Sequence, residues 1–278
     1  METVAFYSYK GGVGRSLLLA YAARFLAKLG KGVVALDFDF DAPGLHYKLE
    51  TDPSFAGGVV PYLLATAEGA SSPPNLEDHM ISVPVATASA GWLRLMPAGP
   101  APHQKYWADV KKFGDRLCQG DPSGQGLMAL LDLKARIEDE LRPDHLLIDA
   151  RAGVTYLGGL ATTILADIVV CMSATNQESV DGTLKVAQAL KIAPRLANQK
   201  PLRLVPVLSR ATEADPAGYQ IAYVHVREID EKIFALPHDG LDASEVVREA
   251  SPLYEAYMGL FQEIFPSRQH QPAAPENL

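Results

Sequence analysis

A glycine-rich stretch near the start of the chain places a lysine, an arginine and a serine around three glycines. Residues 4–7 are apolar and predict a strand, and apolar side chains recur at helical spacing after the stretch. Between a strand and a helix, glycines allow a sharp turn whose backbone N–H groups point at an anion, and the helix N-terminus adds positive potential. The pattern predicts a phosphate cradle formed by Lys10, Gly11, Gly12, Val13, Gly14, Arg15, Ser16 and Leu17.

Two side chains of the cradle suit a nucleoside triphosphate. Arg15 is placed to reach the β- and γ-phosphates, and Ser16 is placed to ligate Mg²⁺. The ordinary P-loop pattern has glycine where this chain has Tyr9 and lysine where it has Arg15. The alternative is a chance glycine-rich loop, but strand, loop and helix follow one another in the required order.

Carboxylates follow two further apolar runs that predict buried parallel strands. Asp37 and Asp39 come after residues 33–36, and Asp149 comes directly after residues 145–148. Open α/β sheets bind ligands at the carboxyl ends of their strands, so we expect these acids beside the cradle. A carboxylate there accepts hydrogen bonds from metal-bound water. The alternative for the first pair is an acidic strand end that caps the next loop.

The cradle resembles the deviant P-loop of the ParA/MinD-type ATPases (SIMIBI class), which reads Lys-Gly-Gly-Val-Gly-Lys-Ser/Thr. Lys10 matches that family's signature lysine, and only the second lysine is changed, to Arg15. The resemblance implies that Lys10 reaches across a two-fold interface to the nucleotide of a second subunit. The alternative is that Lys10 serves its own subunit's phosphates or faces solvent.

The acidic strand ends resemble the Walker A′ and Walker B segments of the same family. The resemblance implies that Asp39 orients the attacking water, and that Asp37, Asp149 and Ser16 lie on the metal side. Arg151 stands in the second switch, where the family usually has proline. It either acts as an arginine finger in cis or pairs with Asp149 or another neighbouring acid.

Two later segments resemble the base-binding side of the family. Arg210 follows Ser209 at a strand end where the family commonly has the asparagine that reads the purine, and its guanidinium suits stacking on a base. Pro237 and Asp239 resemble a segment whose backbone lies along the adenine.

The net charge and the cysteine count indicate which kinds of partner and which cellular compartment to expect. The net charge of -8 argues against a general nucleic-acid binder, and we interpret the basic stretch 185–210 as a solvated surface rather than an anion-binding one. Two cysteines, Cys118 and Cys171, cannot form a disulfide scaffold, which favours a reducing compartment. With no signal peptide or membrane-spanning run in the pattern, we expect a cytoplasmic protein.

The alternation of strand and helix patterns predicts one α/β domain over residues 1–266. We expect the three-layer fold of P-loop NTPases, with a mostly parallel sheet and helices on both faces. Residues 267–278 predict a disordered tail that lacks the amphipathic face of a membrane anchor. Helices are expected at 59–67, 103–118, 127–141, 184–190 and 252–265, with Ser179 and Asp181 as caps before the fourth.

The resemblance implies an ATP-binding switch that dimerises with ATP, hydrolyses it slowly with Mg²⁺ and regulates an unidentified protein partner. The alternative is a non-hydrolysing scaffold that senses nucleotide. The retained acids and Ser16 favour hydrolysis, whereas Arg15 and the missing switch prolines favour the scaffold.

Overall fold

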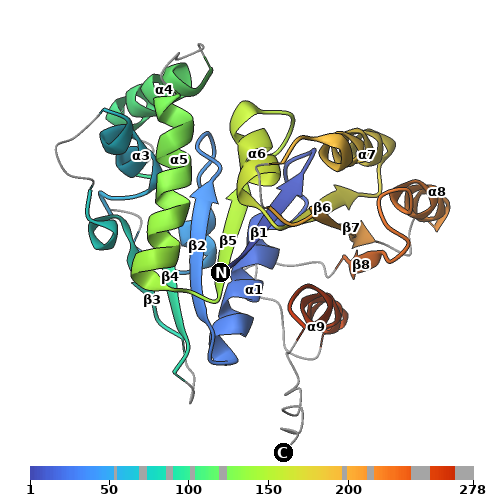
Figure 1. The fold of residues 1–278 in the computed structure, drawn as a ribbon. Helices are drawn as coiled ribbons and strands as arrows, with labels where there is room; N and C mark the ends of the chain where they lie inside the picture. The colour runs from blue at the N-terminus through green and yellow to red at the C-terminus, as the bar shows by residue number, and fades with distance from the viewer. Residues whose placement is uncertain are drawn as a thin grey trace, which may run out of the picture.

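A computed structural model of the chain describes residues 1–52, 55–68, 74–85, 90–100, 104–118, 124–195, 199–211, 216–238 and 251–266 (Figure 1). Its strands are β1 (Glu2–Ser8), β2 (Gly32–Phe38), β3 (Ile81–Val83), β4 (Trp92–Met96), β5 (His145–Ala150), β6 (Ile168–Ala174), β7 (Arg203–Ala211) and β8 (Phe234–Pro237). They form one sheet in the order β3-β4-β2-β5-β1-β6-β7-β8. Neighbours are parallel except β3 and β4, which confirms the predicted mostly parallel sheet.

Helices cover both faces of the sheet, as the pattern predicts (Figure 1). One face packs against α1 (Arg15–Lys28), α2 (Leu45–Lys48) and α9 (Pro252–Ile264). The other face packs against α3 (Val59–Ala67), α4 (Gln104–Cys118), α5 (Gln125–Arg136), η2 (Ile137–Leu141), α6 (Tyr156–Leu160), η3 (Ala161–Leu165), α7 (Gln177–Ile192) and α8 (Pro216–Val226). A short 3₁₀ turn, η1 (Leu76–His79), precedes β3.

The central strands β1, β2 and β5 are buried almost throughout because helices lie above and below them. Continuous apolar runs are typical of parallel strands in that position. The register pairs Asp37 of β2 with Asp149 of β5, and Phe6 of β1 with the same aspartate. The fold therefore brings acids that are far apart in the sequence to one edge of the sheet, beside the end of β1.

Two helix boundaries differ from the predictions. The expected helix 127–141 is α5 continued by the π-helix η2. The expected helix 184–190 begins much earlier, at Gln177, because the Asn176 side chain accepts the Ser179 N–H as its N-cap. The prediction that Ser179 and Asp181 cap this helix was wrong; the Ser179 hydroxyl instead accepts the Ala174 N–H.

Some predictions concern residues that the structure does not describe. The tail 267–278, Asp239 and the side chain of Cys118 lie outside the described part of the chain. Cys171 is described and is a buried free thiol in β6, as expected of a core residue. Within the described residues, no helix combines the length and apolar character needed to cross a membrane.

Candidate nucleotide site

The loop between β1 and α1 borders a cavity of about 600 Å³ at the carboxyl edge of the sheet. Gly12 and Gly14 have φ of 74° and 83°, in the left-handed region that favours glycine. The first hydrogen bond inside α1 runs from the Leu18 N–H to the Gly14 carbonyl. The N–H groups just before Leu18 therefore have no partner within the helix and are available to an anion. The cavity is lined by the predicted cradle residues Gly11, Gly12, Val13, Gly14, Arg15, Ser16 and Leu17.

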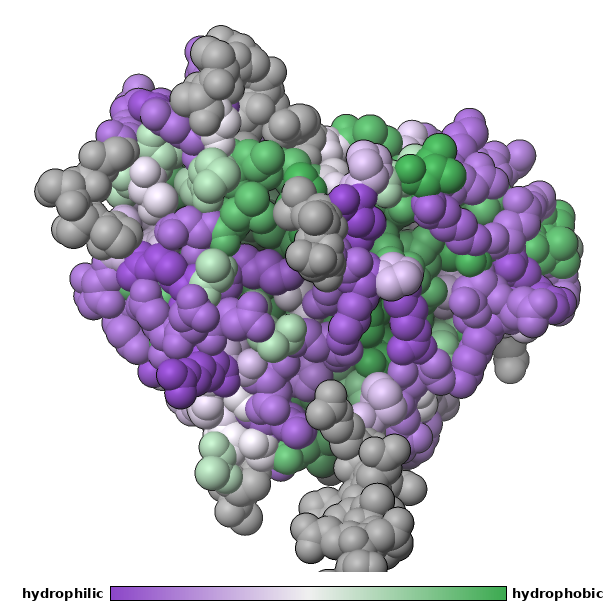
Figure 2. All heavy atoms as spheres, viewed as in Figure 1, coloured by the Kyte–Doolittle hydropathy of each residue, from purple (hydrophilic) through white to green (hydrophobic). Residues whose placement is uncertain are grey.

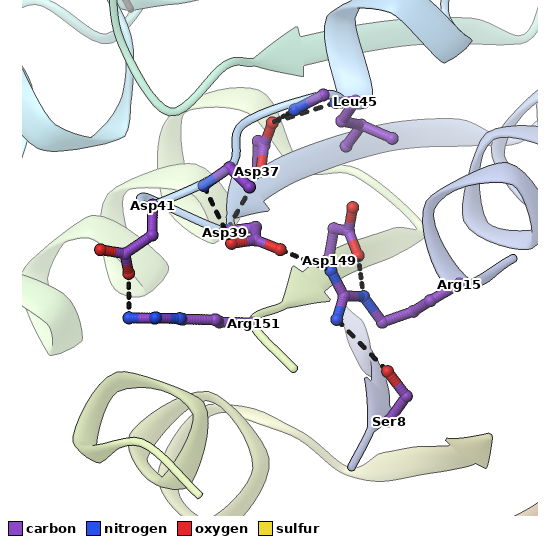
Figure 3. Close-up of polar contacts among 10 residues, drawn as sticks. Ser8, Arg15, Asp37, Asp39, Asp41, Leu45, Asp149 and Arg151 are labelled. Carbon is purple, nitrogen blue, oxygen red and sulfur yellow. Dashed lines mark hydrogen bonds and ion pairs between the residues drawn. The ribbon is translucent and has the colours of Figure 1, made fainter. Parts of the chain in front are cut away.

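Arg15 lies at the first position of α1 and its side chain is buried. Its guanidinium turns toward the neighbouring strand ends (Figure 3). Nε donates to Asp149 Oδ1 at 2.5 Å, and a terminal nitrogen donates to Asp39 Oδ2 at 2.9 Å. The other terminal nitrogen contacts the Ser8 hydroxyl at 3.4 Å. In this structure the predicted phosphate-binding residue is therefore held by two of the predicted active-site acids.

Asp37 shapes the loop that follows β2. One carboxylate oxygen accepts the Asp39 N–H at 3.1 Å, and the other accepts the Gly44 and Leu45 N–H groups, each at 3.1 Å. Burial, together with the nearby charge of Asp149, raises the pKa of Asp37 to about 8. Burial also raises the pKa of Asp149, and the Arg15 guanidinium opposes that shift. These contacts give Asp37 a loop-positioning role, and its metal role stays a prediction.

Ser16 and Asp149 have the chemistry and proximity to take part in a Mg²⁺ site. The Ser16 hydroxyl lies close enough to Asp149 to lower the pKa of that carboxyl. Within the described ranges, no group of three or more His, Cys, Asp and Glu side chains could hold a metal by itself. Mg²⁺ commonly combines one or two carboxylates with water and substrate phosphates, so this donor set fits it once a phosphate is present.

Lys10 lies at the mouth of the loop and is not among the residues that line the cavity. Its ammonium forms an ion pair of 2.5 Å with Glu178 of α7, and the two side chains are 43% and 70% exposed. An exposed pair of this kind contributes little to stability, so Lys10 can leave it readily. The neighbouring Tyr9 ring lies against Gly182 of the same helix.

We expect Gly182→Ala to lower the free energy of unfolding by about 1–3 kcal/mol, the usual cost of overfilling a packed site. An added Cβ would overlap the Tyr9 ring. Gly259→Ala in α9 is the matched control, because nothing lies within 4 Å of its added Cβ. It should raise the stability by about 0.5–1 kcal/mol, the helix preference of Ala over Gly. Urea unfolding of both variants provides the test, and equal stabilities would contradict the contact.

Arg151 is paired with a neighbouring acid, which was one of its two predicted roles. Its guanidinium contacts the Asp41 carboxylate in the loop after β2 (Figure 3), and both side chains are about two-fifths exposed. The pair joins the loop after β2 to the loop after β5, beside the cavity. In this arrangement Arg151 does not point at the cradle, so the cis arginine finger finds no support in the geometry.

Two predicted base-side residues belong to the lining of the cavity. Arg210 and Pro237 both line it, and Arg210 has a positive φ of 54° at its strand end. The sequence does not predict the apolar contribution of α9, whose Leu253 and Tyr257 also line the cavity. Their helical spacing indicated a buried face of α9 but not that this face borders a cavity.

Three side chains of the basic stretch are used in structural contacts. Lys191 donates to the Glu228 carbonyl, and Arg195 donates to the Thr163 and Ala166 carbonyls. Arg203 forms an ion pair with Glu263. These contacts support the interpretation of the stretch as part of the folded surface rather than a polyanion-binding patch.

Solved structures match this architecture over nearly the whole chain. The septum site-determining protein MinD from Pyrococcus horikoshii, solved with Mg-ADP, gives a TM-score of 0.69 at 17% identity, covering 95% of this chain and 96% of that chain. The chain has the MinD-type P-loop fold. McdA from Cyanothece, solved with ATP, gives a TM-score of 0.66 at 18% identity, covering 97% of this chain and 98% of that chain.

The MinD-type fold also extends to an enzyme. Cobyrinic acid a,c-diamide synthase from Mycobacterium smegmatis, solved with ADP and magnesium, gives a TM-score of 0.67 at 17% identity, covering 95% of this chain and 94% of that chain. The scan against family models finds no match to the sequence, and the search of curated proteins finds none either. Because these identities are low, the matches establish the fold and say nothing of activity.

Proposed function

We propose that this MinD-type chain is an ATP-binding switch that hydrolyses ATP slowly with Mg²⁺, dimerises in its ATP state and regulates a partner protein. The observation that carries the proposal is the glycine cradle, open to a cavity of about 600 Å³ that Ser16 and Asp39 also line. The phosphates would lie against the backbone N–H groups of the cradle, and the base would lie between Arg210 and Pro237.

Three fold relatives support the choice of ligand and partner. Two of them were solved with Mg-ADP or ATP, and MinD from Aquifex aeolicus was solved as a complex with MinC. The molecular surface supports a protein contact at the same edge. Figure 2 shows apolar residues gathered near the edge where the parallel strands end, and Val154, in the loop after β5, is 79% exposed.

A specific observation also favours the second candidate, a nucleotide-sensing scaffold without hydrolysis. Arg15 forms an ion pair with Asp39, the acid proposed to orient the attacking water. The two functions separate in one experiment, in which bound nucleotide and released phosphate are measured in the same sample with ATP and GTP. Slow phosphate release that depends on Mg²⁺ supports the switch, whereas bound ATP that stays intact supports the scaffold.

We expect Arg15→Ala to weaken ATP binding by roughly tenfold to a hundredfold, the effect of losing a charge-assisted hydrogen bond. The substitution removes a positive charge near the phosphates and leaves Asp39 and Asp149 to repel them. Arg15→Lys should retain binding because it keeps the charge. Equilibrium binding of a fluorescent ATP analogue measures both variants, and an Arg15→Ala protein that binds as tightly as the parent would show that Arg15 does not contact the phosphates.

A further inference from the structure

The Arg15 guanidinium occupies the position at which a divalent cation would meet the strand-end acids. It contacts Asp149 at 2.5 Å and Asp39 at 2.9 Å, and the exposed fraction of its side chain is only 8%. In the described part of the chain, neither aspartate has another ion-pair partner. A buried guanidinium with two carboxylate partners is held far more firmly than an exposed ion pair.

We propose that Arg15 is the resident cation of the nucleotide-free site, and that a triphosphate admits Mg²⁺ by drawing Arg15 away from Asp149 and Asp39. This inference rests on the proposed function and adds an order of binding, in which the triphosphate binds first and Mg²⁺ second. The alternative arrangement, a metal bound at Asp149 beside an unmoved guanidinium, places like charges next to each other at a buried site.

The geometry explains how a phosphate would release Arg15. The cradle loop leads directly into Arg15, the first residue of α1, so an anion in the cradle would lie within the reach of that side chain. A planar guanidinium binds phosphate oxygens in the two-pronged manner in which it binds carboxylates, so exchange of partners keeps its hydrogen bonds satisfied. The movement frees an Asp149 oxygen next to the Ser16 hydroxyl, where Mg²⁺ has its fitting donors.

The release also affects Asp39. Its Oδ2 accepts a hydrogen bond from Arg15, while Oδ1 accepts the Ala42 N–H at 3.3 Å. Departure of Arg15 frees Oδ2 to accept a hydrogen bond from water. The same movement of Arg15 therefore admits the metal and frees Asp39 to bind water. This coupling acts in both directions, so a bound metal also favours the phosphate-bound position of Arg15.

The test is a Mn²⁺ titration of the nucleotide-free protein, with free Mn²⁺ measured by electron paramagnetic resonance. The parent should bind Mn²⁺ weakly, and Arg15→Gln should bind it at least roughly tenfold more tightly, because two neighbouring carboxylates, Asp149 and Asp39, lose their cation. Arg24→Gln is the matched control, since Arg24 lies on the same helix and is paired with an acid, Glu50, outside the site. It should bind Mn²⁺ as the parent does. A parent that binds Mn²⁺ as tightly as Arg15→Gln would overturn the proposal.

Arg15→Lys decides the matter if circular dichroism shows that Arg15→Gln does not fold. A lysine ammonium is a point charge and cannot hold both carboxylates as the fork of Arg15 does. The Arg15→Lys protein should therefore bind Mn²⁺ more tightly than the parent, and an unchanged affinity would contradict the proposal. No nucleotide is present in either titration, so the result does not depend on ATP binding, whose failure would appear in a separate nucleotide titration.

Discussion

Asp39→Ala is expected to retain bound ATP and to lose its turnover by roughly a hundredfold or more, the usual contribution of a positioned base. Asp39 lies after β2, within hydrogen-bond distance of Arg15 and beside the cradle. Its removal leaves the cradle intact, because none of the backbone N–H groups proposed to hold the phosphates depends on this side chain. Phosphate release and bound nucleotide are measured side by side at saturating ATP.

Asp41→Ala is the matched control for this result. Asp41 lies two residues further along the same loop and is paired with Arg151 rather than with Arg15. It should lose only the exposed contact with Arg151 and keep turnover within about twofold of the parent, since such pairs contribute about 0–1 kcal/mol. Unchanged turnover in Asp39→Ala would remove Asp39 from the mechanism, and equal losses in both variants would indicate general damage to the loop.

Lys10→Ala is expected to abolish the ATP-dependent dimer at concentrations at which the parent dimerises. Lys10 lies at the mouth of the loop outside the cavity, where its flexible stem can carry a point charge to a phosphate of a second copy. The Glu178 contact holds it only weakly in the single chain. Molar mass by light scattering is compared without nucleotide, with ADP and with a non-hydrolysable ATP analogue.

Two further variants sharpen the dimer experiment. Glu178→Gln should dimerise slightly more readily with the analogue, because it releases Lys10 from its ion pair. Lys185→Ala in the same helix removes an exposed lysine that forms no described ion pair, and it should behave as the parent does. If Lys10→Ala dimerises as well as the parent, Lys10 does not act across an interface.

The sequence was sufficient for the fold because the signals that determine it are local. The apolar runs at 33–36 and 145–148 predict buried strands, and burial on both sides requires helices above and below the sheet. The start of α7 was missed for the opposite reason. Its first turns carry polar residues without apolar periodicity, so only the Asn176 cap marks the boundary.

The sequence predicts part of the set of residues at the site, but it does not predict which of them pair with each other. Strand ends identify Asp37, Asp39 and Asp149 as neighbours of the cradle, because parallel strands end at one edge. Which acids hold Arg15 depends on the register between strands that are more than a hundred residues apart in the chain. The side-chain direction of Arg15 depends in turn on the burial of those acids, which no local pattern encodes.

The most direct test of the central claim is a calorimetric titration of the parent protein with ATP in the presence of Mg²⁺. We expect saturable binding at one site per chain, weakened in Arg15→Ala and unchanged in Arg24→Gln. Absence of saturable binding to the parent, or binding that Arg15→Ala leaves unchanged, would contradict the assignment of the glycine cradle and Arg15 as a nucleotide site.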